Sequence, residues 1–178
     1  MKTIELKNGD ILLIEKTVPE DAGEVIKYIN EISLESENLT ITPGEFDKSL
    51  DDEKIFIEKV SQSKNCLMIS GKIDGKIVSL LNFNASPRKR IRHVGEFGIS
   101  VKKEFWNMGI GKEMLLYLID WAKETDIIKK INLMVRKDNL PAIQLYKNFG
   151  FEVEGVISRY FKIDNEYYDL LYMGLKID

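Results

Sequence analysis

The chain has 178 residues, of which 44% are hydrophobic and 10% aromatic, which suits one sizeable core and argues against a second domain. Its formal net charge of -3 leaves no basic excess for binding nucleic acid. No stretch has the continuous apolar character of a signal peptide or a membrane span. We therefore expect a single soluble, cytoplasmic domain over residues 1–178, with neither a nucleic-acid nor a membrane partner.

The only cysteine, Cys66, and the only histidine, His93, suggest a thiol nucleophile with its base. Cys66 opens the apolar run Cys66–Ile69, however, where a cysteine usually packs as a small hydrophobe, and His93 lies in a basic loop. The packing interpretation is therefore favoured over the dyad. One histidine and one cysteine also argue against a transition-metal site.

The first third of the chain indicates a strand followed by two helices. Residues 11–14 form a short apolar run, and Thr17 with Glu20 three residues later matches a capping box that opens a helix. Residues 39–49 contain Thr, Pro and Gly and predict a loop, after which apolar spacing suggests a second helix around residues 55–60.

The middle of the chain indicates strands. Two apolar runs, 66–69 and 77–83, flank Asp74-Gly75, a strong hairpin signal because a type I′ turn needs positive φ. The basic cluster within residues 88–92 is more typical of a solvated loop than of an anion site. Residues 94–101 predict a strand whose alternate side chains face opposite sides.

The last part of the chain continues the alternation of helix and strand. The expected elements are a helix over 112–124, a strand over 131–135, a helix over 140–149, and a hairpin of 153–163 and 167–177 around Asp164 and Asn165. The fold class is α/β, with a mixed central sheet flanked by helices.

The most informative segment is the turn between the strand at 94–101 and the following helix. Gly109 and Gly111 at a helix N-terminus let backbone N–H groups approach a phosphate closely, and the helix dipole adds to the attraction. Two competing motifs fail. A dinucleotide fingerprint needs glycine where Met114 stands, and a Walker loop needs Ser or Thr where Glu113 stands. An enzyme that uses ATP or NAD is therefore disfavoured.

This turn resembles the main motif of the GNAT superfamily of N-acetyltransferases: a strand, then Gln or Arg, two residues, Gly, one residue, and Gly or Ala. Both glycines match, but Trp106 replaces the Gln or Arg, so the resemblance implies the backbone cradle and leaves a side-chain contact from Trp106 open. A second, more specific match covers residues 139–151, in the family's order and spacing. The resemblance implies the mixed, mainly antiparallel sheet of the GNAT fold.

The resemblance also implies acetyl-CoA as cosubstrate, without a metal, and direct transfer of its acetyl group to an amine within a ternary complex. Tyr146, otherwise a core aromatic of its helix, would protonate the leaving thiolate or donate a hydrogen bond to it. The strand at 94–101 would splay from its neighbour and pair with the pantetheine arm. The implied CoA-binding residues are Ile99, Ser100, Val101, Trp106, Asn107, Met108, Gly109, Ile110, Gly111, Lys112, Asn139, Ala142 and Tyr146.

Glu96 is the candidate base, because it shares a face of its strand with Gly98 and could remove a proton from the incoming ammonium. The alternative is a carboxylate that merely faces solvent. Gly95 and Gly98 are unusual in a buried strand and predict either a bulge or a close approach of backbone to ligand. A non-catalytic CoA or acyl-CoA binding module of the same fold is the alternative function, and whether the chain forms a homodimer stays open.

The acceptor is not identified by the sequence, but an acidic segment suggests that it is cationic. By the family resemblance, the region between the first two helices lines the acceptor side of the cleft, where acidity would attract a cation. The alternative is that these carboxylates cap helices and face water. The segment has eight acidic residues against one basic residue, Lys48: Glu31, Glu35, Glu37, Glu45, Asp47, Asp51, Asp52 and Glu53.

Overall fold

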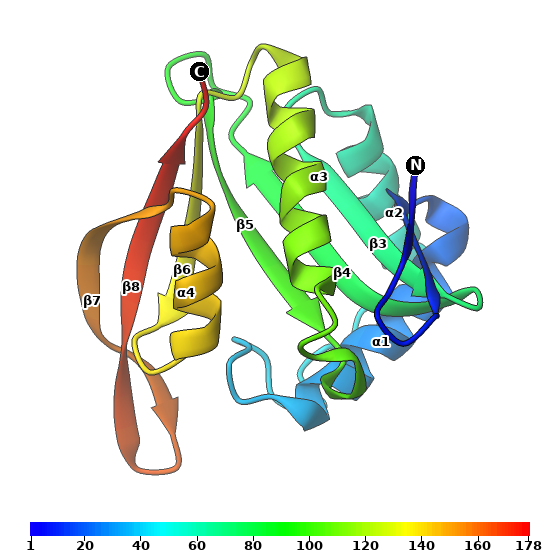
Figure 1. Cartoon of the computed structure of the whole chain (residues 1–178), viewed down its shortest axis with the longest axis horizontal. Helices are drawn as coiled ribbons and strands as arrows, with labels where there is room; N and C mark the ends of the chain where they lie inside the picture. The colour runs from blue at the N-terminus through cyan, green and yellow to red at the C-terminus, as the bar shows by residue number, and fades with distance from the viewer.

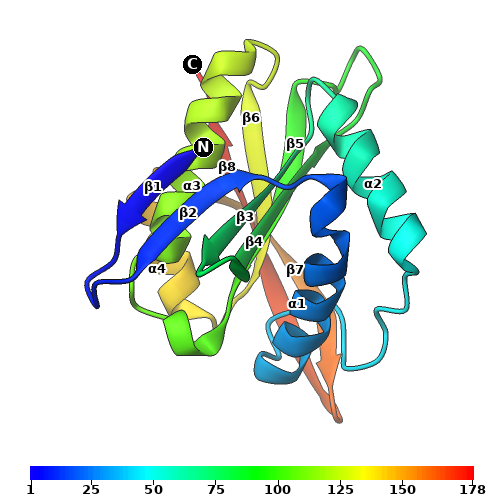
Figure 2. The same cartoon turned by 90° about the vertical axis from the view of Figure 1, so that its right-hand side faces the viewer.

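The computed structural model describes all 178 residues and contains one eight-stranded sheet, with strand order β1-β2-β3-β4-β5-β6-β8-β7. Only β5 and β6 run parallel, so the sheet is mixed and mainly antiparallel, as the sequence predicts. Helices α3 and α4 cover one face of the sheet, and α1 and α2 cover the other (Figure 2). The strands are β1 (Lys2–Glu5), β2 (Ile11–Lys16), β3 (Leu67–Ile73), β4 (Lys76–Ala85), β5 (Val94–Val101), β6 (Lys130–Arg136), β7 (Glu152–Ile163) and β8 (Glu166–Lys176), and the α-helices are α1 (Ala22–Glu35), α2 (Leu50–Gln62), α3 (Ile110–Thr125) and α4 (Leu140–Asn148).

The centre of the sheet opens between β5 and β6. These strands pair only at their first residues, from Val94–Lys130 to Glu96–Asn132, and then diverge towards the bottom of the view in Figure 1. Beyond Glu96, β5 pairs only with β4, and β6 pairs only with β8. The two strands therefore leave a splayed gap whose edges carry backbone groups outside the ladder.

Two hydrophobic clusters hold the helices on the sheet. The larger joins α3 to the sheet through side chains such as Met114, Leu115 and Leu118, and it reaches Tyr146 of α4. The smaller joins α1 and α2 to β3 and β4 only, with Tyr28 and Ile57 at its centre. On the α1/α2 face, the part of the sheet formed by β5, β6 and β8 therefore lies outside this cluster.

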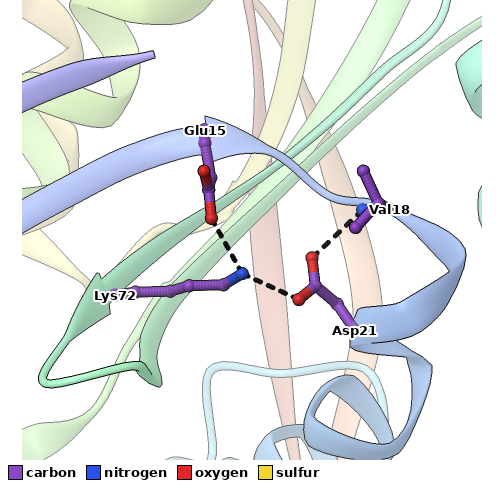
Figure 3. A network of polar contacts seen from close by, with 4 residues as sticks. All are labelled: Glu15, Val18, Asp21 and Lys72. Atoms are coloured by element: carbon purple, nitrogen blue, oxygen red, sulfur yellow. Dashed lines mark hydrogen bonds and ion pairs between the residues drawn. The ribbon is translucent and has the colours of Figure 1, made fainter.

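The entry to α1 differs from the capping box expected at Thr17 and Glu20. The carboxylate of Asp21 accepts a hydrogen bond from Val18 N at 3.1 Å, one residue further along, and a short 3-10 turn at Pro19–Asp21 precedes the helix. Asp21 also pairs with Lys72 of β3 at 2.7 Å, and Lys72 reaches Glu15 of β2 at 2.9 Å (Figure 3). This network fixes the start of α1 to two strands, which a local capping pattern does not reveal.

The remaining elements agree with the sequence, apart from two details. Strand β1, at the edge of the sheet, was not expected from the alternating N-terminal residues. Helix α2 buries Ile57 and Val60, whereas Ile55 is 49% exposed. Both expected hairpins form, and Asp74, Gly75 and Asp164 all have positive φ in their turns. None of the helices combines the length and hydropathy required to cross a membrane.

Candidate active site

The edge of β5 that faces the splayed gap has backbone groups free to bind a ligand. Lys102 N donates to Val78 O of β4 at 2.9 Å, and backbone groups alternate sides along an antiparallel strand. The N–H and C=O groups of Ile99 and Val101 therefore point away from β4, towards the gap. Those of Ser100 face β4, and its carbonyl accepts a hydrogen bond from Ser79 Oγ at 2.8 Å. Of the three residues expected to bind the pantetheine arm, Ile99 and Val101 are positioned for it, and Ser100 is not.

The glycine turn leads directly into the N-terminus of α3. Asn107 and Gly109 both have positive φ, and Gly109 is the N-cap residue without a side-chain cap. The first hydrogen bond within the helix runs from Glu113 N to Gly109 O at 3.1 Å. The amides of Ile110, Gly111 and Lys112 therefore have no acceptor within the helix, as the anion cradle predicted from the sequence requires.

Trp106 has a structural role in this turn that its replacement of Gln or Arg did not reveal. Its indole Nε1 donates to the carbonyl of Val101 at 2.7 Å, while 44% of the residue stays exposed. The side chain thus folds back on the end of β5 and occupies one of the backbone groups that face the gap. Gly111 has a second role in packing. A Cβ at this position would lie 3.4 Å from Leu145 of α4, so the glycine lets α3 and α4 pack closely.

Helix α4 places Tyr146 against β5. The Asn139 side chain accepts from Ala142 N at 3.3 Å, which confirms the expected N-cap. The Tyr146 ring packs edge-on against Phe97 of β5 and against Phe151, with centroids 5.9 Å away in both cases. Its hydroxyl makes no hydrogen bond within the protein, and burial raises the pKa of Tyr146 to about 12. The phenol is therefore a protonated hydrogen-bond donor at neutral pH without a partner in the protein.

Glu96 lies on the opposite face of β5. Phe97 faces Tyr146 on the α3/α4 side, whereas the Ser100 hydroxyl shares a 2.9 Å hydrogen bond with Tyr28 of α1. Side chains alternate between the two faces along a strand, so Glu96 lies on the α1/α2 side together with Ser100. Burial raises the pKa of Glu96, and no cation offsets this effect. The pKa of Tyr172 on β8 is also raised, by burial first and then by the charge of Glu96. Glu96 is thus half-buried and suited to accept a proton.

The cysteine and the histidine do not form a dyad. Cys66 Sγ points at the carbonyl of Ala85, 3.5 Å away, and packs beside the smaller hydrophobic cluster. His93 is exposed, in the loop whose carbonyls at Ser86 and Arg92 accept hydrogen bonds from Asn65. The basic side chains of this loop are exposed, as expected of a solvated loop.

Most carboxylates of the acidic segment serve the fold. Glu31 pairs with Lys102 at 2.5 Å, and Glu53, which is 1% exposed, pairs with Lys48. The others that make hydrogen bonds are Glu35 with Lys103 N, Glu45 with Thr42 N, and Asp52 with Ser49. Only Glu37, Asp47 and Asp51 have side chains without such a partner, so hydrogen bonds and ion pairs within the protein account for five of the eight acids.

The fold and the site together define a class of enzyme. The sheet splays between two parallel strands, with free helix N-terminal amides and a phenol on one side and a carboxylate on the other. This arrangement fits an acyl-CoA-dependent acyltransferase. Residues 31–151 match the model of the acetyltransferase (GNAT) family. The chain belongs to this family and is an acyltransferase. Its residues 139–151 and its glycine turn carry the resemblance in the sequence.

Comparison with individual proteins agrees. The chain is 36% identical over 102 residues to the L-amino acid N-acetyltransferase of Escherichia coli (strain K12), a match that spans 57% of this chain and 63% of that relative. An acetyltransferase of the GNAT family from Streptococcus pneumoniae superposes with a TM-score of 0.91 at 32% identity, over 94% of this chain and 99% of the other. A phosphinothricin acetyltransferase from Sinorhizobium meliloti, solved in complex with acetyl-CoA, shares the fold with a TM-score of 0.79 at 16% identity, over 93% and 88%.

Proposed function

We propose that the chain transfers the acetyl group of acetyl-CoA directly to a primary amine within a ternary complex. The observation that carries the proposal is Tyr146, a buried phenol beside the splayed strands whose hydroxyl has no partner in the protein. The hydroxyl is not one of the fully buried unpaired polar atoms, so it reaches the surface, where a ligand can meet it. In the proposal, the CoA sulfur accepts its hydrogen bond once the cosubstrate is bound.

The cosubstrate binds on the α3/α4 side. The N-terminal amides of α3 hold its pyrophosphate through hydrogen bonds and the helix dipole. The backbone groups of Ile99 and Val101 pair with the pantetheine arm as an added strand would. The Val101 carbonyl already accepts from Trp106, so its N–H and the groups of Ile99 are the free ones. An N–H of this strand edge polarises the thioester carbonyl.

The chemistry needs one base and one donor. Glu96, with its raised pKa, takes a proton from the ammonium, and the amine then attacks the thioester carbon. The N–C bond forms, the C–S bond breaks, and the electron pair leaves on sulfur as a thiolate. The nitrogen loses its second proton to water as the amide forms. Tyr146 donates a hydrogen bond to that thiolate, which then takes a proton from water, while Glu96 releases its proton to water.

The acceptor is best sought with a panel of amines. Thiol release from acetyl-CoA should be followed with L-alanine, L-alaninamide, ethanolamine, ethylamine and spermidine, at low and high salt. A preference for spermidine that shrinks with salt would support the cationic acceptor suggested by the acidic segment. The pairing of five of its carboxylates leads us to expect a weak salt dependence instead. Tight binding of acetyl-CoA in calorimetry without turnover on any amine would favour the non-catalytic binding module. The cytoplasmic location stays a prediction of the sequence.

A further inference from the structure

A polar patch on the α1/α2 face surrounds Glu96. Asn82 of β4 pairs with Gly98, and Asn132 of β6 pairs with Glu96, so the patch of Asn82, Glu96, Gly98 and Asn132 spans three neighbouring strands. Directly paired residues project from the same face of a sheet. The patch lies outside the hydrophobic cluster that fixes α1 and α2 to β3 and β4. It is therefore a polar patch in the middle of the sheet.

Two amide oxygens of this patch have no partner. Asn132 is only 5% exposed, yet its Oδ1 is buried and accepts no hydrogen bond, and the same holds for Oδ1 of Asn82. Buried acceptors are nearly always satisfied in folded proteins, because losing water without replacing it costs free energy. Two such oxygens beside one carboxylate are explained if a ligand brings the hydrogen-bond donors.

The two glycines of β5, Gly95 and Gly98, occupy their positions for different reasons. A Cβ at Gly95 would lie 2.3 Å from the ring of Phe83, so packing explains that glycine. A Cβ at Gly98 would meet no atom within 4 Å, and its φ is not positive. A glycine inside a strand costs stability, and neither packing nor backbone geometry requires this one. What Gly98 does provide is open space between the two amides and Glu96.

The charge of the patch comes from Glu96. The nearest cation on β6, Lys130, pairs with Glu154 at 2.7 Å across Gly174, whose missing Cβ leaves room for that ion pair. Glu96 has no such partner. Tyr172 of β8 borders the patch, because the charge of Glu96 and the side chain of Asn132 both act on the pKa of its hydroxyl. The one charged group of the patch is the Glu96 carboxylate, and its buried unpaired atoms are the two amide oxygens, so the ligand group that matches them is an ammonium ion.

We infer that this patch binds the acceptor: its ammonium group donates to Glu96 and to the carbonyl oxygen of Asn132, and the carbon next to it lies over Gly98. The Asn82 oxygen takes a second donor, so the substrate class is a small primary amine with a hydroxyl, amide or second amino group near the reacting nitrogen. The inference rests on the proposed function. It assigns Asn132 and Asn82 as acceptor-binding residues and Gly98 as a determinant of acceptor size.

The test separates acceptor binding from the rest of catalysis. Asn132→Ala should raise the KM for ethanolamine or L-alaninamide by roughly tenfold or more, since a hydrogen bond to a charged group is lost. Its acetyl-CoA affinity in calorimetry should stay unchanged, and its melting temperature should change little, because the Oδ1 atom of Asn132 accepts no hydrogen bond from the protein. Asn132→Asp keeps an oxygen at this position and should recover part of the lost affinity.

Gly98→Ala tests the same inference without touching a polar group. The added methyl meets no protein atom, so the variant should fold with equal or higher stability, while its kcat/KM for the amine falls. The matched control Gly95→Ala should instead lose stability through its clash with Phe83. Ethanolamine should be preferred to ethylamine, and Asn82→Ala should abolish that preference.

The outcomes distinguish the two proposals. If the wild-type protein binds acetyl-CoA but acetylates no amine, the proposed function fails. If it acetylates amines and both Asn132→Ala and Gly98→Ala keep the wild-type KM for the acceptor, the patch is not the acceptor site, although the function stands. Loss of acetyl-CoA affinity in both variants would equally overturn the assignment.

Discussion

Replacing Tyr146 by phenylalanine removes only the hydroxyl that is expected to meet the CoA sulfur. The Tyr146 hydroxyl has a pKa of about 12, which is about 3.5 above the pKa of an ordinary thiol, about 8.5. Full transfer of the tyrosine proton to the thiolate is therefore uphill by about 5 kcal/mol. Donation of a hydrogen bond is therefore the favoured role. A hydrogen bond to a charged group contributes about 1.5–3 kcal/mol, so kcat should fall by about 10- to 150-fold.

The same structure predicts almost no cost to folding. The Tyr146 hydroxyl makes no hydrogen bond in the protein, so Tyr146→Phe should change the free energy of unfolding by less than about 0.5 kcal/mol. Tyr28→Phe offers the contrast, because that hydroxyl bonds to Ser100 Oγ at 2.9 Å and its loss should cost about 0.5–1.5 kcal/mol. Thermal unfolding of the two variants measures the difference.

The assay for Tyr146→Phe is steady-state thiol release with saturating acetyl-CoA, together with calorimetry for acetyl-CoA affinity. Tyr117→Phe is the matched activity control and should keep the wild-type kcat, since Tyr117 lies on α3 close enough to Glu15 of β2 for that charge to raise its pKa, after burial. Wild-type turnover in Tyr146→Phe would refute the reasoning. A fall in kcat that follows lost acetyl-CoA affinity or lost stability would refute it as well, because the phenol would then act through packing.

Two further predictions concern charged groups. The wild-type kcat/KM should rise with pH through the raised pKa of Glu96, and Glu96→Gln should lower kcat/KM and remove that limb from the pH profile. Since the pKa of Glu96 is higher in the folded than in the unfolded state, its ionisation opposes folding. Glu96→Gln should therefore be more stable than the wild type at neutral pH, but not at a pH where Glu96 is protonated in both states. If the difference in stability between the two proteins were the same at both pH values, the prediction would be wrong. Burial lowers the pKa of Lys72, but hydrogen bonds with Asp21 and Glu15 outweigh it and raise the pKa overall, so its stabilisation is present at neutral pH and is lost above the raised pKa. Lys72→Met should therefore lower the free energy of unfolding by about 1–3 kcal/mol at neutral pH. Its acetyl-CoA affinity should stay unchanged. An unaltered melting temperature would show that the network in Figure 3 does not stabilise the fold.

How far the sequence predicts this protein depends on whether a signal is local. The glycine turn, α3, α4 and both hairpins depend on turn residues and apolar spacing within a few positions, and all of them form as expected. The cap of α1 was wrong by one residue because Asp21 is held by Lys72, about fifty residues away in sequence. Two partners of the acidic segment likewise come from the chain after β5: Lys102 pairs with Glu31, and Lys103 N donates to Glu35. Such pairings exist only once the sheet has formed.

Two residues of the candidate site carried a signal that sequence reasoning did not use. Asn132 stands between Ile131 and Leu133, and Asn82 stands between Leu81 and Phe83, so each is flanked by apolar residues in its strand. Asparagine is depleted in strands, so an amide at the centre of a buried strand needs a reason. The alternation of side chains along β4 and β6 places both asparagines on the face of the sheet away from the larger hydrophobic cluster. Glycine gave a weaker signal, since only the structure separates the packing of Gly95 from the open space at Gly98.

The alternation of side chains along β5 explains how one strand can serve two substrates. Its odd-numbered residues face α3 and α4, where Phe97 supports Tyr146 and the backbone edge at Ile99 faces the gap. Its even-numbered residues face the other side, where Glu96 and Gly98 lie in the polar patch. If the two proposals hold, cosubstrate and amine approach from opposite faces and meet where β5 and β6 part. The amine then attacks across the strand without displacing CoA, which is the geometry that direct transfer in a ternary complex requires.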